Sequence, residues 1–364
     1  MSVKAHSNRN LSGSEAVVCS RCVLPGTFPG IRFDEDGVCN FCRDFVSDDA
    51  GAAKARFRAR FEELVGRLGG KGEYDVLVCY SGGKDSTFTL QLLREEYRLN
   101  VLAVTIDNGF VSPGAVENIH KVVKSLDVDH IFFKPRFGLL RRAFVATLSH
   151  NPYSRKSLER ASAVCTTCMS VVKAVALKMA IANRVPLLAY GWSPGQAPIS
   201  ASLFRFNAPM VRTMQQQIRR ALHRVVGPEI DGYFLKDWQL SDTEEFPYQV
   251  SPLGFLEYDE RAILEKIAAL GWEAPRDTDS CSTNCLLNAL ASEVHKDVWG
   301  FHPYAFEVAG LVRRGAMDRQ EGLARLEARP QDRVLRQVCQ RLRIDCDSVT
   351  DLDRRVALPG GELT

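Results

Sequence analysis

Residues Tyr74 to Leu92 read YDVLVCYSGGKDSTFTLQL, and this stretch decides the fold that we expect. It begins with a short apolar run, Val76–Cys79, which is typical of a buried parallel strand. A polar loop, Ser81–Ser86, follows at once and leads into a predicted helix. Two glycines let the loop backbone approach a ligand closely, and a helix start turns free N–H groups toward it. The stretch therefore predicts an anion-binding loop, with phosphate as the expected anion.

The loop sequence SGGKDS resembles the PP-loop signature SGGxDS of the ATP pyrophosphatase superfamily. It is not a Walker A loop, which needs GxxxxGK followed by Ser or Thr. The resemblance implies an enzyme that splits ATP between its α- and β-phosphates and adenylates an oxygen of its substrate. A nitrogen or sulfur nucleophile then displaces AMP. ATP and Mg²⁺ are the implied ligands, and the implied nucleotide contacts are Ser81, Gly82, Gly83, Lys84, Asp85 and Ser86.

Lys84 and Asp85 are the catalytic candidates within this loop. We expect the Lys84 ammonium to stabilise the charge that develops on pyrophosphate. We expect the Asp85 carboxylate to bind the metal or to order the loop.

Strands and helices alternate regularly on both sides of the loop, which predicts an α/β fold with a doubly wound parallel sheet. Ligands of such sheets bind at the carboxyl ends of the strands, so the loop and Asp107 are expected at one edge. The family resemblance makes Asp107 a candidate nucleotide contact, whereas the turn chemistry of Asp-Asn-Gly alone equally predicts a solvated turn. The predicted strands are 74–80, Val101–Ile106, His130–Lys134 and Val185–Tyr190.

Two CxxC pairs lie in residues 17–45, on either side of a Pro/Gly-rich turn. Four thiolates in two such knuckles suit a closed, tetrahedral and structural Zn²⁺ site. A redox pair or an iron site is the alternative interpretation. The predicted zinc ligands are Cys19, Cys22, Cys39 and Cys42.

The same stretch resembles the opening of the N-acetyl sugar amidotransferases, a family of nucleotide-sugar and surface-polysaccharide pathways. The resemblance resumes at the SGGKDS loop and again at RRGAMDRQEGLARL, Arg313–Leu326. It implies amide transfer, in which ammonia from a separate glutaminase subunit displaces AMP.

An inner set of cysteines, Cys165, Cys168, Cys281 and Cys285, departs from that pattern. We expect a helix over Met169–Ala182, preceded by the first pair, whose thiol pKa values the helix dipole would lower. The order of these cysteines resembles the iron–sulfur-dependent PP-loop thiolases of tRNA.

This second resemblance implies a 4Fe–4S cluster on Cys165, Cys168 and one of Cys281 or Cys285. The open iron of such a cluster could hold a sulfide that displaces AMP and gives C=S, which makes Cys165 and Cys168 catalytic candidates. A persulfide or disulfide relay and a second zinc site are the alternatives.

Two basic segments are ambiguous. Lys134–Arg136 with Arg141-Arg142, and the Arg-rich segment 205–224, could each face phosphates or form ordinary charged helix surfaces.

The 364 residues carry a net charge of +3, too weak to argue for nucleic acid by itself. No run of about 18 apolar residues and no secretory signal occur, so we expect a cytoplasmic protein without a membrane contact. The expected partner is a sulfur donor or a glutaminase subunit, and a homodimer is one expected assembly. The expected substrate is a nucleotide sugar, a tRNA or a small metabolite. A non-catalytic zinc-ribbon adaptor with a degenerate nucleotide fold is the remaining alternative.

The expected organisation has five parts. It comprises a disordered lead-in at 1–16, a zinc knuckle at 17–45, a linking helix at 46–73, a PP-loop domain at 74–290 and a helical C-terminal tail at 291–364. The remaining cysteines, Cys79, Cys339 and Cys346, are expected to be structural.

Overall fold

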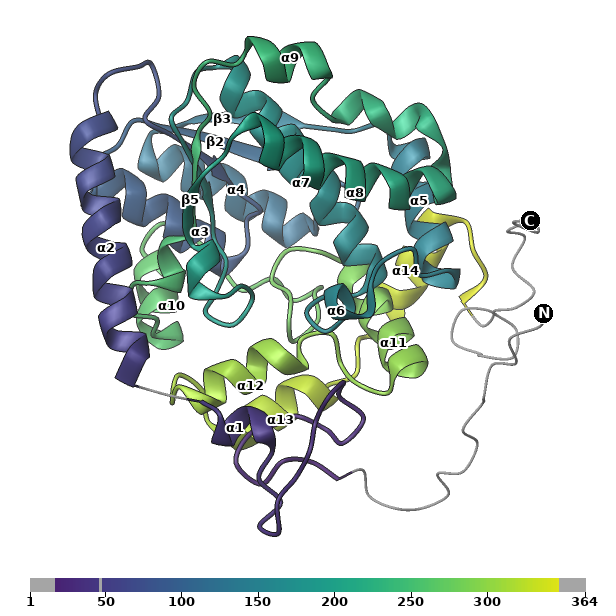
Figure 1. Ribbon diagram of the computed structural model, residues 1–364. Coiled ribbons are helices and arrows are strands. Elements are labelled where there is room, and N and C mark those ends of the chain that lie inside the picture. The colour runs from purple at the N-terminus through teal and green to yellow at the C-terminus, as the bar shows by residue number, and fades with distance from the viewer. Residues whose placement is uncertain (1–16, 46–47, 347–364) are drawn as a thin grey trace.

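The computed structural model describes residues 17–45 and 48–346 (Figure 1). The lead-in expected at 1–16 and the end of the expected tail, 347–364, lie outside the described residues.

A six-stranded sheet forms the centre of the molecule, in the order β3-β2-β1-β4-β6-β5. All neighbouring strands are parallel except β5, which runs antiparallel to β6 at one edge. The predicted α/β fold with a doubly wound parallel sheet is therefore confirmed, except at the antiparallel edge strand β5. The strands are β1 (Val76–Cys79), β2 (Val101–Ile106), β3 (Asp129–Phe133), β4 (Leu187–Tyr190), β5 (Leu203–Arg205) and β6 (Tyr248–Val250).

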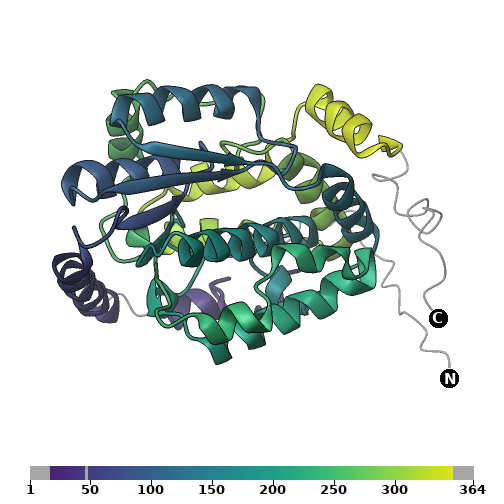
Figure 2. The same cartoon turned by 90° about the horizontal axis from the view of Figure 1, so that it is seen from above.

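Helices cover both faces of this sheet, as the view from above shows (Figure 2). Side chains alternate along β1, so that Val76 and Val78 enter one core and Leu77 enters the other. The first core is closed by α2 (Asp48–Leu68), α3 (Lys84–Gln91), α4 (Pro113–Leu126) and α10 (Glu260–Ala268). The second is closed by α7 (Ala163–Ala182), α8 (Ala208–Val226) and α9 (Asp237–Asp242). A third core joins α7 and α8 to α5 (Phe137–Ser149), α11 (Leu287–Trp299) and α14 (Asp332–Leu342), and the short α6 spans Arg155–Leu158.

Helix α7 is long and apolar enough to cross a membrane by length and composition alone. Its buried side chains, among them Val171, Ala176 and Ala180, pack in the second and third cores of the fold. The helix is therefore accounted for as a core element.

The knuckle and the segment after α11 form one lobe below the sheet (Figure 1). The lobe contains α1 (Asn40–Arg43), α12 (Ala305–Arg313) and α13 (Arg319–Glu327). The Arg319 guanidinium donates to the carbonyl oxygens of Cys19 and Cys22, at 2.9–3.3 Å. We call this unit the knuckle lobe. Elsewhere, Cys339 and Cys346 form a disulfide at the end of α14.

Candidate functional site

The SGGKDS loop lies where β1 ends, next to the point at which the strand order reverses between β1 and β4. Helix α3 begins at Lys84, with Gly83 in an extended conformation before it. The hydroxyls of Ser81 and Ser86 lie 3.0 Å apart, and the Ser86 hydroxyl donates to the Gly83 carbonyl, also at 3.0 Å. These bonds close the loop around the helix start, where free N–H groups favour an anion.

Gly82 is required by the geometry behind the loop. Its φ of +77° is left-handed, and a Cβ there would lie 2.7 Å from the Ala115 carbonyl oxygen on α4. Its own carbonyl oxygen accepts a hydrogen bond from the Trp272 indole N–H at 2.9 Å. The loop is thus fixed from behind, and its open side faces a cavity.

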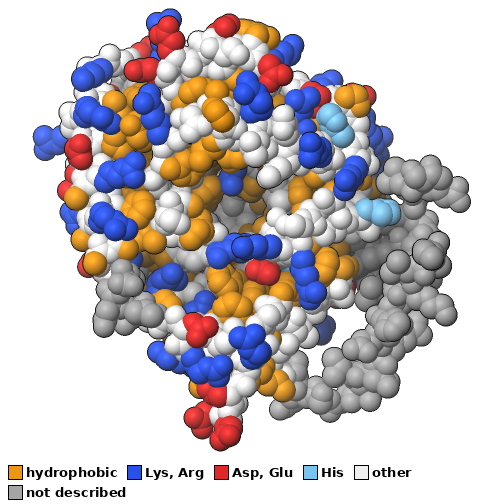
Figure 3. All heavy atoms as spheres, in the orientation of Figure 1, with side chains coloured by type: hydrophobic (Ala, Val, Ile, Leu, Met, Phe, Trp, Pro, Cys, Tyr) orange, Lys and Arg blue, Asp and Glu red, His pale blue; other side chains and the backbone are white. Residues whose placement is uncertain are grey.

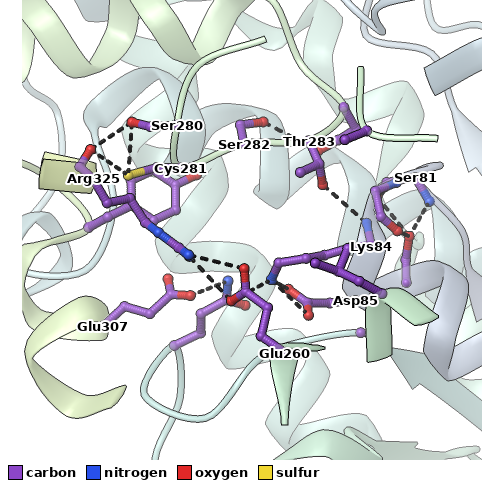
Figure 4. Close-up of a pocket in the computed structure, with 18 of the residues that line it drawn as sticks. Ser81, Lys84, Asp85, Glu260, Ser280, Cys281, Ser282, Thr283, Glu307 and Arg325 are labelled. Atoms are coloured by element: carbon purple, nitrogen blue, oxygen red, sulfur yellow. Dashed lines mark hydrogen bonds and ion pairs between the residues drawn. The ribbon is translucent and has the colours of Figure 1, made fainter. Parts of the chain in front are cut away.

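Alternating charges line that cavity. The Lys84 ammonium lies 3.1 Å from the Asp85 carboxylate, 3.6 Å from Glu260 and 2.9 Å from the Tyr258 hydroxyl. The Arg325 guanidinium contacts the other side of Glu260 at 3.0 Å (Figure 4). Burial alone would lower the pKa of Lys84, but Asp85 and its other partners raise it above its ordinary value. Burial would raise the pKa of Glu260, but Lys84 and Arg325 hold it below its usual range.

The cavity holds about 320 Å³ and lies between the sheet edge and the knuckle lobe. The same face of the molecule is hollowed at its centre, with Lys and Arg side chains along the lower edge of the hollow (Figure 3). Glu307 of α12 and Arg325 of α13 form the wall opposite the loop. A long stretch before α11 also contributes, because the Thr283 hydroxyl accepts a hydrogen bond from the Lys84 N–H at 3.1 Å.

A second cavity of about 240 Å³ adjoins the first and shares Ser81, Ser86 and Gly191 with it. It opens at the carboxyl ends of β1, β2 and β4, and its walls are largely apolar. We call it the thiol cavity, because four cysteines line it: Cys165, Cys168 and Cys285 of the inner set, and Cys79 at the end of β1.

The Asn108 amide N–H groups connect two of these thiols, with Nδ2 at 3.2 Å from Cys168 Sγ and 3.6 Å from Cys285 Sγ. Cys165 donates its S–H to the Asn288 side-chain oxygen at 3.4 Å. Cys281, in contrast, lines the first cavity, where its thiol points to the Arg325 carbonyl oxygen. The structure therefore groups Cys285, and not Cys281, with the pair on α7.

Two expectations about this pair are wrong. The helix begins at Ala163 with a Ser162 N-cap, so Cys165 and Cys168 lie within it and do not precede it. Their thiol pKa values are raised to about 12 and not lowered, because burial outweighs the helix dipole.

The four knuckle cysteines are all buried, and their sulfur atoms lie within 4.8 Å of one another. Among the described residues, no other group of three or more such side chains reaches that spacing. The predicted metal-binding geometry at Cys19, Cys22, Cys39 and Cys42 is therefore present.

Asp107 lies at the predicted sheet edge but outside both cavities. Its carboxylate accepts from the Gly109 N–H at 2.8 Å and pairs with Lys134 at 3.4 Å. Its neighbour Asn108 lines the thiol cavity instead.

The basic segments are bonded within the fold. Arg136 and Arg142 contact Glu229, and Arg141 donates to the Leu342 carbonyl oxygen. In the Arg-rich helix α8, Arg219 and His223 both contact Asp231 at 2.7 Å.

Sequence reasoning missed Asn108, Glu260, Glu307 and Arg325. Glu307 and Arg325 come from the knuckle lobe, more than two hundred residues after the loop. Glu307 carries no local motif, and the resemblance of the Arg313–Leu326 segment gives Arg325 no role. One signal could have located Glu260, because it stands just before Ile263, Leu264 and Ile267, whose spacing is typical of a helix.

No family model matches the chain. An uncharacterized protein of Methanocaldococcus jannaschii is 24% identical over 311 residues, which cover 85% of this chain and 92% of that protein. The glutamine-hydrolyzing GMP synthase of Pyrobaculum aerophilum is 36% identical over 81 residues, 22% of this chain and 15% of that enzyme.

Among solved structures, the chain is similar to the U34-tRNA thiolase NcsA of Methanococcus maripaludis, solved with its 4Fe–4S cluster. The sequence identity is 18%, the TM-score is 0.33, and the match covers 86% of this chain and 91% of the thiolase. A TM-score this low does not establish a shared fold, so the fold assignment rests on the sheet of this chain.

Proposed function

We propose that this protein is an ATP-dependent transferase that adenylates an oxygen of its substrate, releases pyrophosphate, and replaces that oxygen with sulfur. One observation carries the proposal. Three thiols from two distant segments converge on a cavity that shares the Ser81 and Ser86 wall of the anion-binding loop.

The first half-reaction follows from the loop. The two serine hydroxyls and the N–H groups at the start of α3, other than that of Lys84, which donates to Thr283, bind phosphate oxygens. Lys84 supplies positive charge where pyrophosphate leaves, and Arg325 adds a second cation across the cavity. Asp85 and Glu260 are oxygen ligands of the kind that Mg²⁺ prefers, and both lie beside Lys84.

The thiol cavity fits an iron–sulfur cluster better than a single zinc ion. Its three inner thiols do not form a group within 4.8 Å of one another as the knuckle sulfurs do, and a multi-atom cluster is held by more widely spaced cysteines. Cys165, Cys168 and Cys285 would hold the cluster. Three protein thiolates would leave one iron with an open position for a sulfur donor.

Within this cavity the chain's own residues supply positioning. The Asn108 amide donates hydrogen bonds to the sulfur atoms of both Cys168 and Cys285, and the Asn288 side-chain oxygen accepts one from Cys165. The apolar lining, which includes Val104, excludes water from the neighbourhood of an adenylated carbon.

The knuckle is proposed as a structural zinc site. Its four thiols are buried inside the knuckle lobe, so a metal bound by all four would have no open ligand position for catalysis.

Amide transfer is the second candidate. The observations that favour it are the partial match to a glutamine-hydrolyzing synthase and the knuckle, which resembles that of the sugar amidotransferases. Under this alternative the inner thiols are a second zinc site or a redox pair.

The test is metal and acid-labile sulfide analysis of anaerobically purified and reconstituted protein. We expect iron and sulfide in the wild type, loss of both in Cys285→Ser, and retention of both in the matched variant Cys281→Ser. A colourless wild type that holds zinc alone would refute the sulfur-transfer proposal and favour amide transfer. Iron loss in Cys281→Ser with retention in Cys285→Ser would overturn the assignment of the third thiol.

The first half-reaction is tested separately. Formation of AMP and pyrophosphate from ATP and Mg²⁺ is measured with unfractionated tRNA and with a UDP-N-acetyl sugar as acceptors. Acceptor-dependent AMP formation is expected, and the acceptor that supports it identifies the substrate class. No AMP with either acceptor, in protein with a full metal content, would contradict both enzyme proposals for these substrate classes.

A further inference from the structure

Glu307 is a half-buried carboxylate in the wall of the nucleotide cavity, and neither of the resemblances assigns it a role. Its Oε1 accepts hydrogen bonds from the Ser193 hydroxyl at 2.5 Å and from the Gln196 amide at 3.1 Å. Within the described part of the chain, Oε2 makes no hydrogen bond or ion pair that would occupy it. Glu307 lies across the cavity from Lys84 and Asp85 (Figure 4). One oxygen is therefore fixed, and the other is available to a ligand.

The loop that holds Glu307 also touches the anion-binding loop. A Cβ at Gly191 would lie 2.6 Å from Ser86 Cα, and a Cβ at Gly195, whose φ is +106°, would lie 3.1 Å from the Glu307 carbonyl oxygen. Residues 191–196 thus connect the start of α3 to α12 by two close backbone contacts. This connection sets the position of the carboxylate relative to the bound phosphates.

The titratable groups that face Glu307 come from three segments. Lys84 and Asp85 face it from α3, Cys281 from the stretch before α11, and Tyr304 from the turn before α12. Burial and the nearby Asp85 charge together raise the pKa of the Glu307 carboxyl to about 7, although the hydrogen bond from Ser193 opposes this rise. A carboxyl that titrates near neutral pH is suited to proton transfer.

We propose that Glu307 accepts the proton of the nucleophile that displaces AMP. The inference rests on the proposed adenylation, and it holds for either nucleophile. Hydrosulfide or ammonia attacks the adenylated carbon, so that a C–S or C–N bond forms. The C–O bond to AMP breaks, and AMP leaves with its electron pair. The S–H or N–H proton passes to Glu307 Oε2 and from there to solvent.

The kinetic test uses the reconstituted full-length protein with ATP, Mg²⁺, the acceptor that supports AMP formation, and sodium sulfide or ammonium chloride as the nucleophile. Glu307→Gln keeps the size of the side chain and its contact to Ser193 but cannot take a proton. We expect the pyrophosphate burst of the first turnover to persist in this variant. Steady-state turnover should fall about 100-fold, within the range of general-base contributions.

The pH profile separates proton transfer from a structural role. The base works when ionised, so, with the concentration of free hydrosulfide or ammonia held constant at each pH, wild-type turnover should rise with pH through about 7 and then level off. Glu307→Gln should lack this rise, and Glu307→Asp should recover part of the rate with the rise intact. The matched control is Glu229→Gln, an exposed carboxylate outside the cavity, which should behave as the wild type.

A measurement that needs no acceptor completes the test. Infrared titration should show the C=O stretch of one buried carboxylic acid that disappears near pH 7 in the wild type and is missing in Glu307→Gln. No such band, or unchanged turnover and pH profile in a folded Glu307→Gln, would overturn the inference. A wild type without a pyrophosphate burst would instead refute the proposed adenylation, so the two failures are distinguishable.

Discussion

Gly191→Ala tests how the carboxyl end of β4 packs against the anion-binding loop. A Cβ at this position would lie 2.6 Å from Ser86 Cα, 2.7 Å from Ser86 N and 2.8 Å from the Asp85 carbonyl carbon. All three atoms belong to the backbone of α3, which cannot move aside as the end of a flexible side chain can. The substituted loop must therefore withdraw from α3.

The magnitude follows from overpacking. One added methyl group in a well-packed interior typically costs about 1–3 kcal/mol of stability. Because a loss of 1 kcal/mol lowers the Tm by about 2–4 °C in domains of 150–250 residues, we expect a drop of at least about 2 °C. Withdrawal also separates Ser193 and Gln196 from the phosphate site, so AMP formation should fall along with stability.

The assay pairs thermal unfolding with AMP formation, and the matched control is Gly138→Ala. Gly138 lies in α5, where a Cβ would meet nothing within 4 Å, so the Tm should stay the same or rise slightly. An unchanged Tm and unchanged AMP formation in Gly191→Ala would refute the packing that connects β4, the anion-binding loop and α12.

Two further predictions concern the loop and the knuckle lobe. Lys84→Ala should abolish AMP formation, measured by chromatography, because the cation beside Asp85 and Glu260 is lost, while the zinc content stays the same. AMP formation at the wild-type rate would show that Lys84 does not stabilise the leaving pyrophosphate. Arg319→Ala should destabilise the knuckle lobe by about 1–3 kcal/mol, because the charge-assisted hydrogen bonds to the carbonyls of Cys19 and Cys22 are lost. Amide hydrogen exchange in α13 should therefore become faster. The exposed Arg261→Ala serves as the control for Arg319, and equal exchange in both variants would contradict the scaffold role.

The sequence predicted the parts of the fold that repeat a local pattern. The apolar run Val101–Ile106 predicted β2 with the bounds that the structure has. Strands β5 and β6 were not foreseen, because each has three residues and a polar member, too short for a period to be recognised. Their place in the sheet is decided by long-range pairing alone.

The same distinction applies to the site. SGGKDS is contiguous, so one segment predicts both its shape and its ligand. Whether Cys281 or Cys285 is the third thiol of the inner set can be decided only from the structure. Cys285, just before α11, lines the thiol cavity, whereas Cys281 points toward Arg325. Glu307 has no sequence signature, and the Arg313–Leu326 segment that contains Arg325 does not show that this side chain reaches the cavity, because both positions depend on how the knuckle packs against α12 and α13.

The charge pattern of the cavity implies that ATP binds together with Mg²⁺. Lys84 is paired with Asp85 and Glu260, and Arg325 is paired with Glu260 and Glu321. A triphosphate that enters alone must break these pairs and leave carboxylates beside its own negative charge. Mg²⁺ removes that conflict, because the carboxylates can turn to the metal while the two cations turn to phosphate oxygens. ATP should therefore bind much more weakly when EDTA replaces Mg²⁺. Arg325 belongs to α13, so it can turn to phosphate oxygens only when the knuckle lobe is folded against the cavity. ATP binding at the anion-binding loop therefore depends on the buried cysteines that hold this lobe together.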